Sequence, residues 1–180
     1  MTPSQTVQPK SFHGVSIYTS IAEEFDAASS HVALIDRSWM GMLELRGADS
    51  LDFLHRLSTN DLLRTRPGDV RSTVLLTEKG RIIDYIHVLV GESSSFLQVS
   101  PGNEERVQRW LEKYTIMEDV QTARRSSSLS QFTLLGPLAR DRAEEIFRCS
   151  LPLDKHVEVA LPFASVRVSS QYEFHTTVVD

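Results

Sequence analysis

The sequence predicts an α+β fold in which an antiparallel sheet carries helices on one face. Short stretches of alternating polarity exchange regularly with stretches whose apolar residues have helical spacing. A turn signal at Lys79-Gly80 joins two apolar runs into a hairpin. The resulting order of strands and helices resembles a split βαβ arrangement with an extra hairpin strand. A chain of 180 residues is long enough for one such domain or for two small subdomains that share a core.

The first half of the chain supplies a tail, a strand and a helix. We expect residues 1–30 to form a polar tail and a short helix, and residues 31–180 to form the domain. Met40 to Gly47 alternates as a strand does. Asp49 or Ser50 can cap the helix that follows, which has an apolar face of Leu51, Phe53, Leu54 and Leu57.

The stretch LLTEKGRIIDYIHVL, residues 75–89, predicts two antiparallel strands with a carboxylate in an apolar row. Alternation places Asp84 on one face with Ile82 and Ile86, and Tyr85 on the other face. A buried carboxylate needs a partner, which can be a backbone N–H, a cationic side chain or a ligand amine. Asp84 is therefore predicted to be a structural anchor, a ligand contact or a proton-transfer group.

The second half repeats the pattern. A strand at Phe96–Val99 leads to a helix that Asn103 can cap, with an apolar face of Val107, Trp110, Leu111 and Tyr114. Two strands, a helix with Pro137 in its first turn and two or three Val-rich and Thr-rich strands follow. The segments ELRGADSLDFLHRL and TLLGPLARDRAEEI share a strand–glycine–helix pattern, which indicates a duplication.

Composition and motifs exclude several classes of function. The net charge of −5 and the lack of a long basic run disfavour nucleic-acid binding. No run approaches the roughly 18 apolar residues of a membrane span, and we expect no secretory signal. A single cysteine, Cys149, permits no internal disulfide and fits a cytoplasmic location. Phosphate-binding glycine loops and the HExxH and GxSxG motifs do not occur, and the scattered histidines predict no metal site.

Four segments together resemble one family. ALIDRSWMGMLELRGADSLDFLHRLSTND, RPGDVRSTVLLTEKGRIIDYIHVL, QVSPGNEERVQRWLEK and LLGPLAR follow one another at the family's spacing. They resemble the aminomethyltransferase (T-protein) of the glycine cleavage system and its folate-binding relatives, which include proteins that support iron–sulfur cluster maturation. The resemblance runs from about Ala33 to Arg140 and implies a folate-binding domain of two intertwined halves.

The resemblance also implies a site. Tetrahydrofolate would lie in a central hole, with Met40 matching the methionine that lines the family's pocket. The family's catalytic acid is the second aspartate of a "DD" pair. Here the first aspartate is Asp84, and Tyr85 stands at the second position.

Other departures accompany Tyr85. Ser72, Ser100 and Trp39 replace a pocket tyrosine or leucine, a pocket asparagine and a histidine of the family pattern. QYEFH, residues 171–175, is at best a trace of the acidic motif that holds the pterin. The family's C-terminal barrel and the cysteine motif of the iron–sulfur relatives are not found in the sequence, whereas the KGR turn at residues 79–81 is closer to those relatives.

We therefore predict a shortened, non-catalytic member with no catalytic residue and no metal. Its ligand residues would be Met40 and Asp84, and its ligand tetrahydrofolate or another folate-like molecule. It would otherwise act as an interaction module. The alternatives are an aminomethyltransferase or one-carbon transfer subunit completed by another chain, and an accessory factor in iron–sulfur cluster maturation. Because the shortened fold leaves an apolar face or sheet edge open, we also expect a homodimer or a partner protein.

Overall fold

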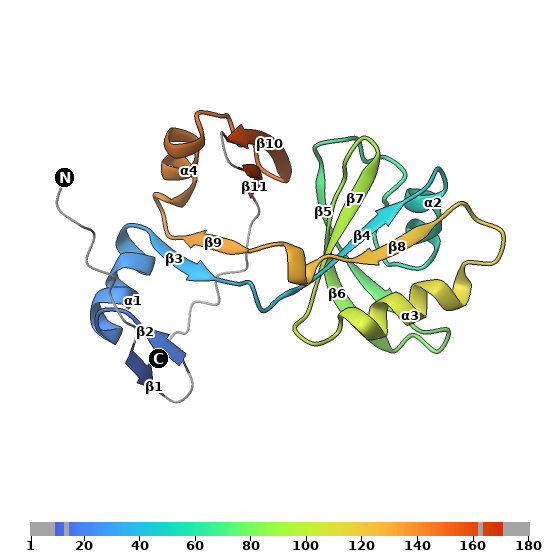
Figure 1. Cartoon of the computed structure of the whole chain (residues 1–180), viewed down its shortest axis with the longest axis horizontal. Coiled ribbons are helices and arrows are strands. Elements are labelled where there is room, and N and C mark those ends of the chain that lie inside the picture. Colours follow the sequence, from blue (N-terminus) through green and yellow to red (C-terminus); the bar gives the residue numbers. More distant parts are fainter. Residues whose placement is uncertain (1–9, 13–14, 162–163, 171–180) are drawn as a thin grey trace.

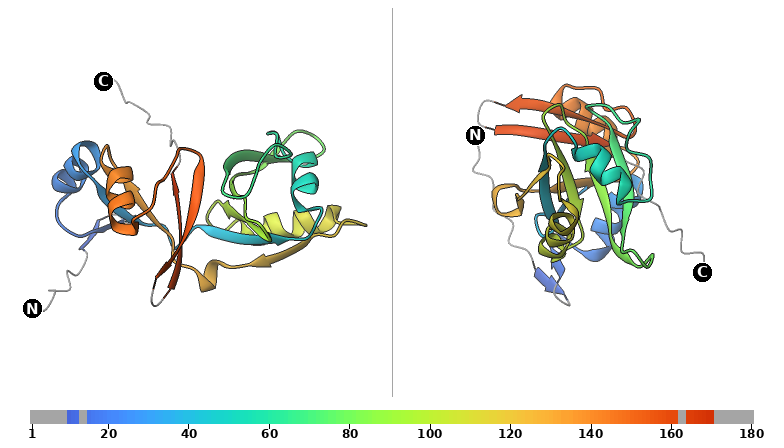
Figure 2. Two further views of the ribbon diagram at one scale, coloured as in Figure 1. Left: turned by 90° about the horizontal axis from the view of Figure 1, so that it is seen from above. Right: turned by 90° about the vertical axis from the view of Figure 1, so that its right-hand side faces the viewer.

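The computed structural model describes residues 10–12, 15–161 and 164–170. These residues form a larger and a smaller half (Figure 1), with a hairpin of β10 (Lys155–Leu161) and β11 (Ala164–Ser170) standing between them (Figure 2). The chain crosses between the halves twice. It passes from β3 (Ala33–Asp36) to β4 (Gly41–Arg46), and from β8 (Gln121–Arg124) through a short 3₁₀ turn to β9 (Phe132–Leu135).

The larger half is a five-stranded antiparallel sheet with helices on one face. Its strand order is β5-β6-β7-β4-β8, in which β5 is Val70–Leu76, β6 is Ile82–Leu89 and β7 is Ser94–Val99. Helices α2 (Ser50–Arg56) and α3 (Glu104–Tyr114) bury Phe53, Leu54, Val107 and Leu111 against apolar residues of the strands. The predicted fold class is confirmed, and the described strands close no barrel.

The opposite face of this sheet carries no helix, and we call it the open face. Cross-strand pairing puts side chains that lie directly opposite each other on the same face. The open face therefore carries the residues that alternate with the core residues Leu43, Ile86 and Leu97. The β10–β11 hairpin covers part of it, because the Arg167 guanidinium lies 4.3 Å from the ring centroid of Phe96.

The smaller half is thin. It consists of the two-stranded antiparallel sheet β3–β9, helices α1 (Ile21–Ser30) and α4 (Ala139–Phe147), and the short strands β1 (Lys10–Phe12) and β2 (Val15–Ile17). No residue of α1 is buried, and Phe25 and Leu34 are 72% and 66% exposed. Two strands with two short helices cannot cover each other's apolar side chains.

The two strand–glycine–helix segments have the same local geometry. Gly47 joins β4 to α2 with a φ of +113°, and Gly136 joins β9 to α4 with a φ of +127°. A side chain at either position would collide with a backbone carbonyl, of Asp119 at Gly47 and of His31 at Gly136. Both the left-handed backbone and the close approach require glycine. The two segments therefore share their local geometry, while the duplication itself stays a prediction.

Other sequence expectations are met in part. The predicted strands and helices from β4 to α4 are all found, but β3 was missed. Asp49 and Asn103 precede their helices without making a side-chain cap. The Asp49 carboxylate accepts the Asp119 N–H at 2.8 Å, and the Asn103 amide donates to the Ile83 carbonyl at 3.0 Å. These side chains hold distant segments together instead.

Two further expectations concern the ends of the chain and membrane-spanning helices. The N-terminal tail and a third C-terminal strand, with the QYEFH segment, fall largely on residues 1–9, 13–14 and 171–180, outside the described residues. Within the described ranges, no helix has the length and apolar content to cross a membrane.

The β10–β11 hairpin is fastened to the larger half by a buried histidine and an ion pair. The His156 backbone N–H donates to the Gly68 carbonyl, and its Nε2–H donates to the Val90 carbonyl, both at 2.7 Å. Lys155 pairs with the mostly buried carboxylate of Asp69. Burial lowers the pKa of His156, so this side chain is neutral at pH 7.

We predict that acid weakens this attachment. The unfolded chain binds a proton at His156 near pH 6.5, whereas the folded chain resists it, so stability falls as the pH drops from about 6.5 towards the lowered folded pKa. Asp69, Glu158 and the Arg167 cation also act on His156, and Asp69 protonates only below its own lowered pKa. Thermal unfolding should show a lower melting temperature at pH 5.5 than at pH 7. His156→Gln should remove this difference, and an equal drop in that variant would contradict the prediction.

Candidate functional site

Asp84 is a buried anchor that ties β6 to the segment between β7 and α3. Its side chain is 4% exposed. Oδ2 accepts the Ser100 backbone N–H at 2.9 Å, and Oδ1 accepts the Ser100 hydroxyl at 2.6 Å and the Tyr85 N–H at 2.9 Å. Three donors satisfy the buried carboxylate, so no ligand is needed to hold it.

A β-bulge next to Asp84 corrects the expected alternation. Leu75 pairs with Asp84 and Leu76 pairs with Ile82, which leaves Ile83 as the extra residue. Ile83 is therefore buried, whereas Ile82 is 67% exposed, the reverse of the predicted faces. The Asn103 amide satisfies the carbonyl of this extra residue.

The bulge lies before Asp84, so alternation is regular from Asp84 onwards. Asp84 and Ile86 face the helices, and Tyr85 lies on the open face with 48% of its surface exposed. The Tyr85 ring meets the His87 ring edge-on, with centroids 5.1 Å apart. The bulge therefore does not bring the Asp84 carboxylate to the position of Tyr85.

A row of polar side chains crosses the open face. Ser72, His87, Gln98 and Met42 lie directly opposite one another on β5, β6, β7 and β4. Nδ1 of His87 is 2.8 Å from the Ser72 hydroxyl. We call Ser72, His87 and Gln98 the polar row.

The polar row reaches the first crossover between the halves. Nε2 of Gln98 donates to Oε1 of Gln131 at 2.8 Å, and Nε2 of Gln131 donates to the Met40 carbonyl at 3.0 Å. Met40 is half-buried, and the neighbouring Trp39 is 60% exposed with its indole N–H bonded to the Asp36 carbonyl. Neither Trp39 nor Tyr85 is packed into a core.

The structure thus separates the two predicted ligand residues. Met40 lies at the end of the polar row, and the Asp84 carboxylate is held on the helix side of the sheet. Sequence reasoning missed His87, Gln98 and Gln131 as site candidates. Alternation from Tyr85 could have indicated His87, whereas Gln98 and Gln131 depend on strand pairing and on the crossover.

The carboxylate on the open face of β4 belongs to Glu44, and it is already paired. Glu44 is 3% exposed and contacts the guanidinium groups of Arg46 and Arg125. Burial alone would raise its pKa, but the bonds from Arg125 and Arg46 outweigh burial and hold the pKa below its usual range. Glu44 is consequently ionised and is not a proton donor at neutral pH.

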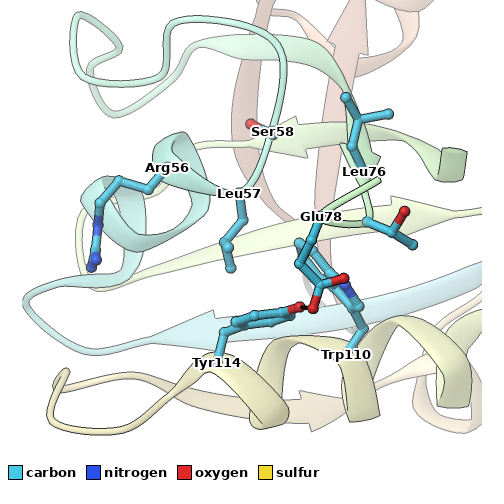
Figure 3. A pocket seen from close by; sticks show the side chains of 8 residues that line it. Arg56, Leu57, Ser58, Leu76, Glu78, Trp110 and Tyr114 are labelled. Carbon is cyan, nitrogen blue, oxygen red and sulfur yellow. Dashed lines mark hydrogen bonds between the residues drawn. The ribbon is translucent and has the colours of Figure 1, made fainter. Parts of the chain in front are cut away.

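A separate hollow of about 230 Å³ lies on the helix side of the sheet, between the end of α2, the β5–β6 turn and α3 (Figure 3). Trp110 and Tyr114 stand along α3 with ring centroids 5.2 Å apart. The Tyr114 hydroxyl and the Lys113 ammonium group bond to Glu78, lowering the pKa of that carboxyl to about 2. Ligand pockets usually measure about 300–1,000 Å³, so this hollow is small for a folate.

No group of three or more potential metal ligands occurs among the residues that the structure describes. The chemistry of the polar row is that of hydrogen-bonding side chains beside an aromatic ring. Together with the two strand–glycine–helix segments, it defines an α+β domain of two joined halves with a polar, helix-free sheet face.

Comparison with known proteins shows the family. The family model described as the GCVT N-terminal domain matches residues 3–179. The aminomethyltransferase of Chlorobium phaeovibrioides is 36% identical over 124 residues, which cover 68% of this chain and 34% of that protein. The aminomethyltransferase of Anoxybacillus flavithermus is 31% identical over 150 residues, covering 79% and 41%.

Among solved structures, the glycine cleavage system aminomethyltransferase T from Bartonella henselae has a similar fold. The TM-score is 0.67 at 19% identity, with 86% of this chain and 44% of that chain covered. The chain belongs to the glycine cleavage T-protein family, as the resemblance implied. It spans about a third to two fifths of the length of the curated relatives it matches.

We predict that Asp84→Ala destabilises the fold. The substitution leaves the partly buried donors of Ser100 without their charged acceptor, which costs about 3 kcal/mol of unfolding free energy. Urea denaturation measures this change. Asp52→Ala removes an exposed carboxylate from a helix-surface ion pair and should cost less than about 0.5 kcal/mol. Equal costs for the two variants would show that Asp84 is no anchor.

Proposed function

We propose that this protein is a non-catalytic binding module that holds a folate-like or other flat heteroaromatic molecule on the open face. One observation carries the proposal. The site's aspartate, Asp84, is bound to Ser100 on the helix side, while Tyr85 stands on the open face where the family pattern has its catalytic acid. The family membership and the polar row support a retained binding surface.

The polar row offers the groups that such a ligand requires. A serine hydroxyl, an imidazole and a carboxamide provide both donors and acceptors, which match the ring nitrogens and carbonyls of a pterin-like edge. The Tyr85 ring beside His87 adds an aromatic surface for stacking. Met40 would contact the ligand where the row meets the crossover, and Asp84 would support the site through the backbone of β6 rather than touch the ligand.

The same geometry argues against group transfer by this chain alone. General acid–base catalysis needs a carboxyl within hydrogen-bond reach of the substrate amine. Asp84 faces the helices, and Glu44 is paired with two arginines. We therefore infer that the chain does not release ammonia from an aminomethylated lipoyl carrier.

A second candidate is a one-carbon transfer subunit whose remaining parts come from another chain. The observation that favours it is length, because matched aminomethyltransferases are more than twice as long as the aligned segment. In this case a partner would supply the missing acid. A third candidate is an accessory role in iron–sulfur cluster maturation. It is supported by the KGR turn at residues 79–81, whose sequence is closer to the family's iron–sulfur relatives.

Exposed apolar side chains on the smaller half favour self-association. Phe25 on α1, Leu34 on β3 and Phe132 on β9 are each at least 60% exposed. Large exposed apolar side chains on one half of a protein are a feature of interaction surfaces. We infer a homodimer through this half, and a cytoplasmic location stays a prediction that rests on the single Cys149.

The ligand proposal predicts a thermal shift. Addition of 5-formyltetrahydrofolate at about 100 times its dissociation constant should stabilise the protein by about 2.7 kcal/mol, which raises the melting temperature of a chain of this length by about 7 °C. Tyr85→Phe keeps the ring and should retain most of the shift. Met40→Ala and Gln98→Ala should lose it.

Met117→Ala is the matched control for Met40→Ala, because Met117 is 93% exposed on the loop after α3. No shift at millimolar ligand would contradict binding and favour the interaction-module function. Tetrahydrofolate-dependent release of ammonia by the purified chain would contradict the non-catalytic function.

Self-association has its own test. Light scattering at tens of micromolar should give the mass of a dimer, and Leu34→Asp should convert it to a monomer because a charge in an apolar interface is costly. Ile116→Asp, at an exposed apolar position on the larger half, should leave the dimer intact. A monomeric wild-type chain would rule out the homodimer.

A further inference from the structure

Gln131 ties the polar row to both crossovers between the halves. Its backbone carbonyl accepts the Arg37 N–H at 2.7 Å, and its backbone N–H donates to the Ser38 hydroxyl at 3.1 Å. Its side chain bonds to the Met40 carbonyl and to the Gln98 carboxamide. All four polar groups of Gln131 are therefore engaged, and they hold its side chain in one orientation.

The backbone carbonyl of Met40 fixes the direction of the bonds between these amides, because a carbonyl oxygen can only accept. The group of Gln131 that lies 3.0 Å from this carbonyl must be its NH2 group. The side-chain oxygen of Gln131 therefore faces Gln98, and the group of Gln98 that meets it at 2.8 Å must in turn be an NH2 group. Rotation of either carboxamide would bring two oxygens together.

The direction of these bonds decides what Gln98 offers to a ligand. Its NH2 group is bonded to Gln131, and its carbonyl Oε1 accepts a hydrogen bond from no residue that the structure describes. Gln98 is half-buried on the open face and lies directly opposite His87. A partly buried acceptor gains free energy when it receives a donor. The polar row therefore presents an acceptor at Gln98.

We propose that Gln131 is a positioning residue that makes the open face selective for flat ligands whose edge carries an N–H donor. The Gln98 carbonyl accepts that N–H, whereas a ligand with a ring oxygen at the same place would bring two acceptors together. A cyclic amide edge, in which a carbonyl adjoins an N–H, belongs to the favoured class. Gln131 has this role only if the open face binds a flat ligand, so the inference rests on the function proposed above.

Two probes of nearly equal size test the preference. Isocarbostyril carries a cyclic amide N–H, and isocoumarin carries a ring oxygen in its place. NMR titrations of the full chain should give a dissociation constant at least about tenfold lower for isocarbostyril than for isocoumarin. Shifts of the Gln98 and His87 side-chain resonances would identify the open face as the site of binding.

Variants of Gln131 separate positioning from a structural role. Gln131→Leu removes the acceptor that holds the Gln98 NH2 group, so Gln98 can rotate and the preference should fall to about twofold or less. Gln131→Glu loses the bond to Met40 but still accepts from Gln98, and it should keep the preference. A role limited to holding the crossover would weaken both probes equally and leave their ratio unchanged.

Gln108→Leu is the matched control, because Gln108 lies on α3 and bonds to Glu112 there. This variant should bind both probes as the wild-type protein does. Equal dissociation constants of the two probes for the wild-type protein, with shifts at Gln98, would overturn the role of Gln131 alone. A ratio that Gln131→Leu leaves unchanged would also overturn it.

Failure of both probes to shift any open-face resonance would overturn the inference as well. The thermal shift with 5-formyltetrahydrofolate then shows whether the proposed function falls with it. A retained thermal shift would leave binding on the open face in place, and its absence would contradict both.

Discussion

The bond between the Asp84 carboxylate and Ser100 is the interaction on which the arrangement of the larger half depends. A carboxylate placed among apolar core residues is unstable unless donors surround it, and two groups of Ser100 with the Tyr85 N–H provide them. The bond fixes β6 against the start of α3, just after the bulge at Ile83. Because side chains alternate along a strand, it also fixes Tyr85 and His87 on the open face.

This constraint links the fold to the proposed chemistry. The Asp84 carboxylate contributes stability, and the polar row on the open face consists of hydrogen-bonding side chains beside an aromatic ring. Such a surface can orient a flat ligand, and the Glu44 carboxylate on it is paired with two arginines rather than free to donate a proton. Membership of the T-protein family supports the proposed binding surface, and Tyr85 with the paired Glu44 supports the proposal that the function is limited to binding.

Local sequence patterns predicted the elements that are long or periodic, such as α2, α3 and the β5–β6 hairpin, because burial imposes their spacing. The four-residue strand β3 was not predicted, because its pairing with β9 joins residues about a hundred positions apart in the chain. The bulge at Ile83 and the use of Asn103 away from its helix end also arise from tertiary contacts. The polar row could not be predicted, because it depends on the register of three paired strands and alternation within one strand does not provide that register. The shared geometry of the two strand–glycine–helix segments could be predicted because Gly47 and Gly136 each meet a local steric requirement.

A crystal structure of the full chain with 5-formyltetrahydrofolate would test the central claim most directly, namely that Asp84 anchors the fold while the open face binds the ligand. The ligand density should lie across Ser72, His87 and Gln98, and the Asp84 carboxylate should still be bonded to the Ser100 N–H and hydroxyl. A ligand amine bonded to Asp84, with the Ser100 bonds broken, would contradict it.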